Sequence, residues 1–295
     1  MVRAPGIRNV LCSLVSAHVT KDTNDAYTSS CLAYVWSGDV IVGCSGSPAV
    51  VLTGMSTSLG AALVFFIKAT SHKMRDALIG LSAGLMLSVT TLSLIPEALG
   101  PHKENFFQVI VGIALGATAF LIADNYLPHI HGMIIPDKPL TSGMRATLLM
   151  VAAIVIHNFP EGFATGTAYS GGVTVFGSTV ALGIALQNIP EGFLVSVPLR
   201  SQGYSTRNSF VAGVLSGVVE PFCAVAALIL VGFFGGLLPY ALAFGGGAML
   251  YVIFDEMIPE SHSHGYERAA TTSFMIGFLF MAIVNYVATM MFGAA

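Results

Sequence analysis

From residue 48 onward the chain alternates between long apolar runs and short polar connections. A bilayer span needs ~20 mostly apolar residues, and it must be helical because lipid offers backbone groups no hydrogen-bond partner. The pattern predicts eight spans, numbered here in chain order: 48–67, 77–98, 106–127, 146–169, 173–199, 209–232, 237–259 and 271–293. The sequence therefore predicts an all-α membrane protein with eight transmembrane helices.

The first 47 residues break this pattern. They contain seven Ser and three Asp, and they hold no sustained apolar run. We therefore expect two parts, a polar and poorly ordered N-terminal extension over 1–47 and a membrane domain over 48–295.

Composition supports a membrane protein and excludes several other classes. Hydrophobic residues make up 55% of the chain and charged residues only 9%, whereas soluble domains carry about 25% charged residues. The net charge of -3 gives no basic excess, so we expect no nucleic-acid partner. The four Cys form no C-x-x-C pair, which argues against a thiolate metal site.

Basic residues gather in the connections on one side of the predicted spans. If the N-terminus is non-cytosolic, the cytosolic side receives Lys68, Lys73, Arg75, Lys138, Arg145, Arg200, Arg207 and Arg268. Outside the N-terminal segment, the loops on the other side receive only Lys103. The positive-inside rule then places both termini on the non-cytosolic side, as an even number of spans requires.

Spans four to six contain acids and a histidine at interior positions: His157, Glu161, Glu191 and Glu220. No Lys or Arg lies within spans two to eight. A charged acid in mid-membrane costs ~2.5–3.5 kcal/mol unless something compensates it. A cation that comes from outside would do so. The alternative is that the acids are protonated and bonded to neighbouring helices.

The spacing of these residues points to a metal. One motif occurs twice, as His157-Asn158-Phe159-Pro160-Glu161-Gly162 and as Gln187-Asn188-Ile189-Pro190-Glu191-Gly192. The first residue and the Glu are four apart and share a helix face, which the Asn flanks. The proline is expected to break the helix and free a backbone carbonyl. Imidazole, carboxylate and carboxamide groups together suit Zn²⁺, with Fe²⁺, Mn²⁺ or Cd²⁺ as further candidates.

A second repeat surrounds the first. Span two ends in Leu94-Ile95-Pro96-Glu97 and span seven in Met257-Ile258-Pro259-Glu260, and this alignment places Met86 opposite Met249. Spans four and five run in opposite directions, as do spans two and seven. The repeats are therefore expected to be inverted, as in many transporters.

A further group of metal-binding residue types lies near the predicted cytosolic ends of spans three and seven: Asp124, His129, His131, Asp255, Glu256, Glu260, His262 and His264. We interpret it as an inner-face route or sensor for metal. Solvated loop histidines are the alternative.

The paired motif, together with Glu220-Pro221 in span six, resembles the ZIP (Zrt/Irt-like) family of divalent metal transporters, in its bacterial or GufA-like branch. The resemblance covers 48–295. It implies eight helices, a metal site between helices four and five, and movement of zinc toward the cytosol, with iron, manganese and cadmium as further substrates.

The resemblance also implies the ligands. His157, Glu161, Gln187 and Glu191 would bind the primary ion, with Met86 as a candidate soft ligand. A second position would be bordered by the residues Asn158, Asn188 and Glu220. Some relatives carry Asp where Asn188 stands, so we expect one tight and one weak site.

Two other functions compete with metal transport. A carrier or channel for protons or other cations would also use buried acids. An intramembrane hydrolase is suggested only by Gly80-Leu81-Ser82-Ala83-Gly84, which lacks the strand-turn-helix context of an esterase. We expect no cofactor, and divalent ions and the lipid bilayer as partners. A homodimer stays open, and the plasma membrane is expected, with an organelle membrane as the alternative.

Overall fold

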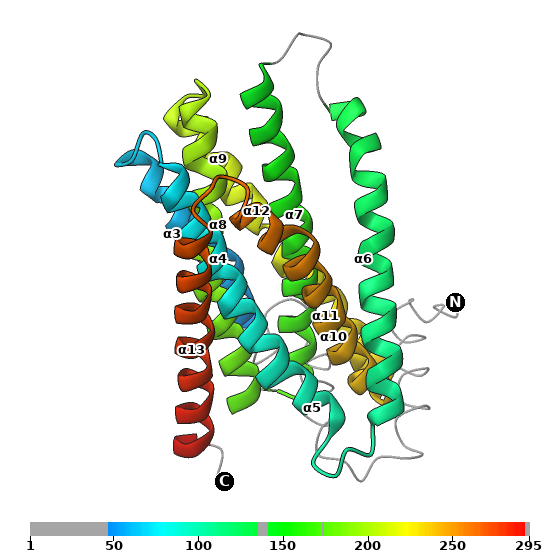
Figure 1. Cartoon of the computed structure of the whole chain (residues 1–295). Coiled ribbons are helices and arrows are strands. Elements are labelled where there is room, and N and C mark those ends of the chain that lie inside the picture. Colours follow the sequence, from blue (N-terminus) through cyan, green and yellow to red (C-terminus); the bar gives the residue numbers. More distant parts are fainter. Residues whose placement is uncertain (1–46, 135–140, 173, 293–295) are drawn as a thin grey trace, which may run out of the picture. The chain divides into compact units, whose positions relative to one another are not determined.

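A computed structural model describes residues 47–134, 141–172 and 174–292 (Figure 1). All regular secondary structure in these residues is helical, and loops and turns connect the helices. Seven helices are long and apolar enough to cross a bilayer, and an eighth apolar helix, Ala49–Phe65, is shorter. At 1.5 Å per residue, its 17 residues extend over only ~26 Å. The all-helical, multi-pass membrane architecture is thus confirmed, whereas the predicted extension lies outside the described residues apart from Ser47.

The elements follow the predicted spans closely. They are α3 (Ser47–Ala62), η1 (Leu63–Phe65), α4 (His72–Val89), η2 (Thr90–Leu94), α5 (Ile95–Leu99), α6 (Phe106–Ile134), α7 (Ser142–Ala168), α8 (Val175–Ser201), α9 (Thr206–Gly217), α10 (Val219–Phe233), η3 (Gly235–Leu237), α11 (Leu238–Val252), η4 (Ile253–Met257), α12 (Ile258–Ser261) and α13 (Glu267–Phe292).

Several helices begin before the apolar run does, because a capping residue fixes the first turn. Ser71 accepts a hydrogen bond from the Met74 backbone N–H, so α4 starts five residues earlier than predicted. Side chains at the same position also cap three other helices: Thr141 before α7, Thr174 before α8 and Ser205 before α9. Each oxygen satisfies a backbone donor that the helix leaves free.

Spans two and seven change their winding at the second repeat. In each span five residues form a π-helical turn, η2 and η4, directly before an Ile-Pro-Glu sequence. Pro96 cannot donate to the carbonyl of Leu92. Asn285 of α13 donates to that carbonyl instead, at 2.9 Å. The two π turns therefore occupy matching places in the two predicted repeats.

Prolines in the other spans have different effects. Span six is interrupted at Val218, between α9 and α10, where Pro221 cannot donate to the carbonyl of Gly217. Helices α7 and α8 continue through Pro160 and Pro190. A break at these two prolines, with its freed carbonyl, stays a prediction.

Glycines bring four helix pairs into close contact. A Cβ added at Gly84 would lie 2.0 Å from the Phe274 carbonyl oxygen, which fixes α4 against α13. A Cβ at Gly116 would lie 2.1 Å from the Phe244 oxygen, in the contact of α6 with α11. Helix α3 packs on α8 through Gly192, and α7 packs on α10 through Gly162. Small residues permit such close backbone contacts in membrane helices.

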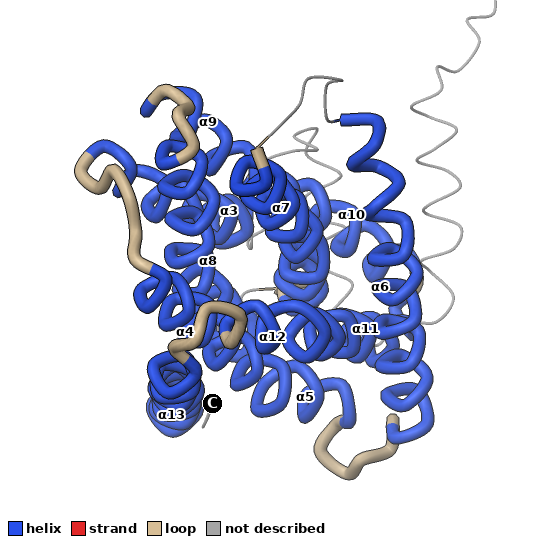
Figure 2. The backbone as a smooth tube through the Cα atoms, turned by 45° about the horizontal axis from the view of Figure 1, so that its top comes forward, coloured by secondary structure: helices blue, strands red, loops and turns tan. Residues whose placement is uncertain are grey.

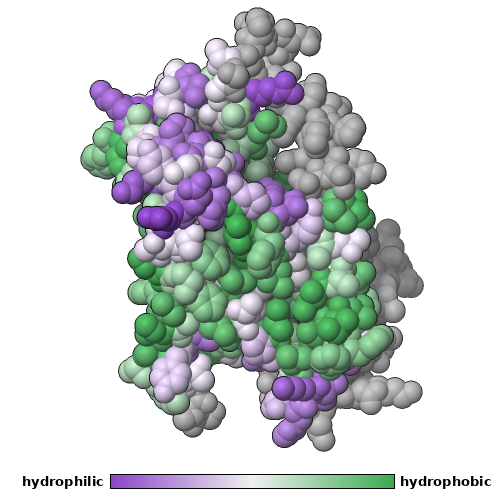
Figure 3. Space-filling view, viewed as in Figure 1, coloured by the Kyte–Doolittle hydropathy of each residue, from purple (hydrophilic) through white to green (hydrophobic). Residues whose placement is uncertain are grey.

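These contacts relate the two halves of the membrane domain (Figure 2). The repeat relation exchanges α3 with span six, α4 with α11, α6 with α13 and α7 with α8. Under this exchange the contact of α4 with α13 becomes that of α11 with α6. In the same way, the contact of α3 with α8 becomes that of span six with α7. The face shown in Figure 3 is apolar over its middle and hydrophilic at both ends, as lipid contact requires. Helices α6 and α13 expose large apolar side chains, including Phe107, Ile283 and Met290.

Candidate metal site

The residues predicted to bind the primary and second ions are all buried within the helix bundle. Six of them are fully enclosed, and His157 and Glu191 are 5% and 2% exposed. They come from α4, α7, α8 and the first turn of α10. The sequence pattern therefore places each of them on an inward-facing position.

The two motif glutamates are held by different neighbours. Gln187 Nε2 donates to Glu161 Oε1 at 2.6 Å, which joins the two motifs directly. Ser82 Oγ, on α4, donates to Glu191 Oε1 at 2.8 Å. Each carboxylate therefore has one oxygen engaged with a neutral donor.

Glu220 lies beside the second motif. Its Oε1 accepts hydrogen bonds from Asn188 Nδ2 at 2.7 Å and from Thr57 Oγ1 at 3.4 Å. Glu220 is the second residue of α10, where the positive end of the helix dipole favours a carboxylate.

The motif asparagines contact equivalent backbone positions. Asn158 Nδ2 donates to the Ser216 carbonyl at 2.6 Å, and Asn188 Nδ2 donates to the Thr53 carbonyl at 3.0 Å. Ser216 and Thr53 each precede a glycine, and these glycines, Gly217 and Gly54, pack against each other. The two asparagines thus connect each motif helix to the close contact between spans one and six.

His157 has a partner that the motif does not reveal. Its Nε2 lies 2.7 Å from Glu256 Oε2, on the π turn η4 of span seven. Glu256 belongs to the predicted inner-face group, and the structure also brings its carboxylate into contact with His157 of the first motif. An acid thus faces the imidazole from the opposite repeat.

Unsatisfied oxygens mark this region. Six buried side-chain oxygens of the motifs and Glu220 have no hydrogen-bond partner among the described residues: Asn158 Oδ1, Glu161 Oε2, Gln187 Oε1, Asn188 Oδ1, Glu191 Oε2 and Glu220 Oε2. Buried polar atoms are nearly always bonded, and an unpaired acceptor is costly in an apolar setting. Six acceptors without donors form an environment that a cation would stabilise.

The described side chains are not closed around an ion. Within the described part of the chain, no three His, Cys, Asp or Glu side chains come together as a metal site. Amide and hydroxyl donors occupy one oxygen of each glutamate. An incoming ion would have to displace the Gln187 amide from Glu161.

The two repeat-related methionines are both fully buried. Met86 lies one turn beyond Ser82 on α4, and therefore on the helix face that contacts Glu191. Met249 Sδ lies 3.7 Å from Thr90 Oγ1. Soft sulfur is thus available beside the oxygen-rich region.

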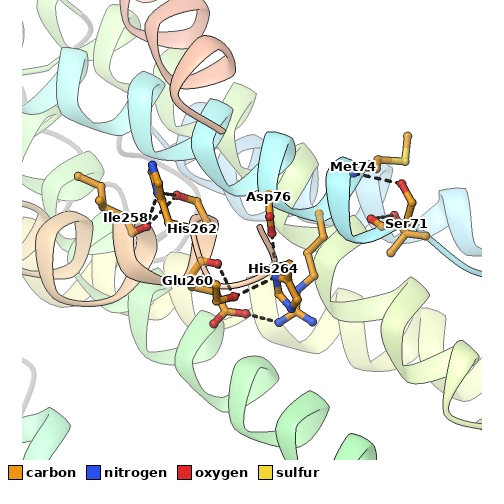
Figure 4. Close-up of polar contacts among 11 residues, drawn as sticks. Ser71, Met74, Asp76, Ile258, Glu260, His262 and His264 are labelled. Atoms are coloured by element: carbon orange, nitrogen blue, oxygen red, sulfur yellow. Dashed lines mark hydrogen bonds and ion pairs between the residues drawn. The ribbon is translucent and has the colours of Figure 1, made fainter. Parts of the chain in front are cut away.

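The predicted inner-face group does not form one cluster in the described residues. Asp255 lines a groove of about 360 Å³ between α6 and α11. Glu260 pairs with Arg75, and His264 Nδ1 lies 2.8 Å from Asp76 Oδ1 (Figure 4). His262 Nδ1 lies 2.9 Å from the Ile258 carbonyl oxygen. The side chains of Asp124, His129 and His131 lie outside the described residues.

Sequence reasoning missed four polar residues with defined contacts: Thr57, Arg75, Asp76 and Ser82. Ser82 was noted only within a G-x-S-x-G pattern. Its position four residues before Met86 was the available signal, because it places both side chains on one helix face.

Comparison with known proteins identifies the family. A model of the ZIP zinc transporter family matches residues 135–285. The zinc transporter GufA of Myxococcus xanthus is 36% identical over 250 residues, covering 82% of this chain and 98% of its own length. The chain belongs to the ZIP family.

Other relatives of this ZIP protein extend the match. The zinc transporter ZIPB of Bordetella bronchiseptica is 32% identical, covering 78% of this chain and 77% of its own length. The human zinc transporter ZIP11 is 29% identical, with 76% and 92% covered. The protein is therefore a multi-pass membrane transporter of divalent metal and not an enzyme, so the hydrolase alternative is wrong.

Proposed function

We propose that this protein moves Zn²⁺ toward the cytosol through the buried region between α7 and α8, with Fe²⁺, Mn²⁺ and Cd²⁺ as further substrates. The observation that carries the proposal is the group of six unpaired buried oxygens on the repeated motifs and Glu220. Oxygen donors beside one imidazole and a thioether suit a borderline divalent ion better than Mg²⁺ or Ca²⁺.

The primary position uses His157, Glu161, Gln187 and Glu191, with Met86 as a soft ligand from α4. Binding frees Glu161 from the Gln187 amide, and the amide can then turn its oxygen toward the ion. The 2.7 Å contact with Glu256 leaves Nδ1 of His157 as the free ring nitrogen unless that contact opens. Glu256 therefore competes with the metal ion for the imidazole of His157.

A second, weaker position lies beside Asn158, Asn188 and Glu220. If the three buried glutamates are all ionised, they carry -3, and one divalent ion leaves -1, which tolerates a second ion. Only Glu220 brings a charge to this position, because both asparagines are neutral.

The direction of transport follows from the proposed topology. The close helix pairs exchange under the repeat relation, which supports inverted repeats. The basic connections support a cytosolic end where α4 begins and α12 ends, with both termini non-cytosolic. We expect the plasma membrane as the location.

Zinc flux into proteoliposomes tests the function. The purified protein is reconstituted with a zinc-sensitive dye inside, with and without a proton gradient. We expect zinc to enter down its own gradient, and Glu191→Gln to stop it, whereas Glu267→Gln in the exposed first turn of α13 should not. Flux that requires protons but not metal would favour the carrier or channel alternative.

Cysteine labelling tests the topology. Ser263→Cys, in the α12–α13 loop, should resist an impermeant thiol reagent applied outside intact cells. Ser170→Cys, between α7 and α8, should react. The natural cysteines are labelled in parallel as a background, and the opposite pattern would overturn the proposed direction.

A further inference from the structure

We propose a second kind of metal site, separate from the central region, where α4 begins and the α12–α13 loop passes it. His264 and His72 bind a divalent ion such as Zn²⁺ through their imidazole nitrogens, and Asp76 holds His264 in position (Figure 4). His72 and Asp76 belong to the start of α4, and His264 belongs to the loop that follows α12.

The contact between His264 and Asp76 prepares the imidazole for metal. His264 Nδ1 lies 2.8 Å from Asp76 Oδ1, and Asp76 is fully buried. A carboxylate that accepts the proton of one ring nitrogen leaves the lone pair of the other nitrogen free, an arrangement common behind metal-binding histidines. The Nε2 atom of His264 is thereby the ligand atom, on a side chain that is 19% exposed.

His72 supplies a second nitrogen. Its ring is stacked on that of His264, with centroids 4.5 Å apart and planes 23° from parallel. His72 is the exposed first residue of α4, so its ring can rotate about the side-chain bonds toward an ion bound at His264. Water completes the coordination.

The charges around Asp76 favour a bound cation. Asp76 Oδ2 is buried and has no hydrogen-bond partner among the described residues. The neighbouring cation, Arg75, is paired with Glu260. A buried carboxylate is costly when it is incompletely compensated. An ion on His264 would provide compensation through the ring.

The location gives the site a consequence for transport, which rests on the proposed function. Helix α4 carries Ser82, which holds Glu191, and the loop follows the π turn that carries Glu256. An ion shared by His72 and His264 ties these two segments together at the proposed cytosolic end. We expect zinc arriving there to slow further transport.

Zinc counting on the purified full-length protein tests the binding. Glu161→Gln/Glu191→Gln removes the central site, and bound zinc is measured by mass spectrometry after equilibrium dialysis. We expect this double variant to retain one more bound zinc per chain than the triple variant that also carries His264→Gln. His102→Gln, at an exposed histidine in the connection between α5 and α6, is the matched control and should retain it. Equal retention with and without His264→Gln would overturn the proposal.

Asp76→Asn separates positioning from a merely structural role. It should weaken zinc binding ~10–100-fold while the site can still be filled at higher zinc. Unchanged affinity would contradict the role of Asp76. His264→Gln keeps a donor for Asp76, and matching thermal unfolding curves without zinc check that the variants fold. Loss of transport in central variants leaves this zinc count unaffected, so the two proposals fail separately.

Discussion

The two copies of the repeated motif share a pattern but not an environment. The most apolar stretch of α8 is 78% buried, whereas that of α7 is only 44% buried. Glu191 of α8 is held by Ser82 from a neighbouring helix, and Glu161 of α7 is held by Gln187 from the other motif. His157 is in contact with Glu256 from span seven.

This difference shows how a symmetric sequence can give an asymmetric site. Helix α8 is packed on α3, α4, α7 and α9, and α7 is packed on α8, α9, α10 and α11. The side chains of α7 are engaged with groups that an ion can replace, a neutral amide at Glu161 and an acid at His157. We therefore expect α7 to provide the adjustable side of the metal site.

The largest effect is expected where the two motifs are alike. Glu161→Gln and Glu191→Gln should each lower zinc flux by ~100-fold or more, because a lost charge in a buried site costs several kcal/mol. Radioactive zinc uptake, normalised to the amount of protein in the membrane, measures this. Normal flux in either variant would remove that residue from the primary site.

His157 should give the next largest effect, since of the two motif helices α7 alone carries an imidazole. His157→Ala should lower zinc flux ~10-fold and shift the preference toward harder ions such as Mn²⁺. Glu256→Ala frees the imidazole, and its effect on zinc flux should be much smaller in a His157→Ala background than in the unaltered protein. Purely additive effects in competition uptake assays would show that the two side chains act independently.

The hydroxyl that holds Glu191 should contribute less. Ser82→Ala removes one hydrogen bond, typically worth ~0.5–1.5 kcal/mol, and should weaken zinc binding a few-fold to tenfold. Ser88 of the same helix is the matched control, because its buried Oγ has no partner among the described residues. If Ser88→Ala weakens binding as much, the effect belongs to packing of α4 and not to Glu191.

Of the substitutions considered, Asn188→Asp is expected to change zinc flux least. Its main effect should be on zinc binding at the weak site. The new carboxylate would face Glu220, whose Oε1 is now 2.7 Å from the Asn188 amide. We expect lower thermal stability without zinc and a larger stabilisation by zinc, with the weak site strengthened about tenfold for one added carboxylate. Calorimetric titration decides, and two equally tight sites in the unaltered protein would exclude the present assignment.

The sequence predicts spans and inward faces better than it predicts neighbours. Apolar length located the seven long helices and the shorter helix over Ala49–Phe65, and i,i+4 spacing found the buried positions of Glu161 and Glu191, because both depend on local geometry. The contact of His157 with Glu256 joins residues 99 apart and depends on how spans four and seven pack. Nothing in the local pattern of either segment encodes that distance.

Local rules also misplaced some boundaries and roles. The start of α4 depends on the cap at Ser71, which a hydropathy pattern does not register. Asp76 was overlooked because it lies in a polar first turn, where a solvated side chain is the usual outcome. Its complete burial depends on the returning α12–α13 loop, a long-range feature.

The glycine contacts between α4 and α13 have a mechanical consequence. Gly80, Gly84 and Gly277 leave no space between the two backbones, and Asn285 adds a hydrogen bond to Leu92. A displacement of α4, which carries Met86 and Ser82, must therefore move α13 with it. Because α13 exposes much of its length to the surroundings, that motion works directly against the acyl chains. Bilayer thickness should therefore influence the rate at which the metal ligands of α4 rearrange.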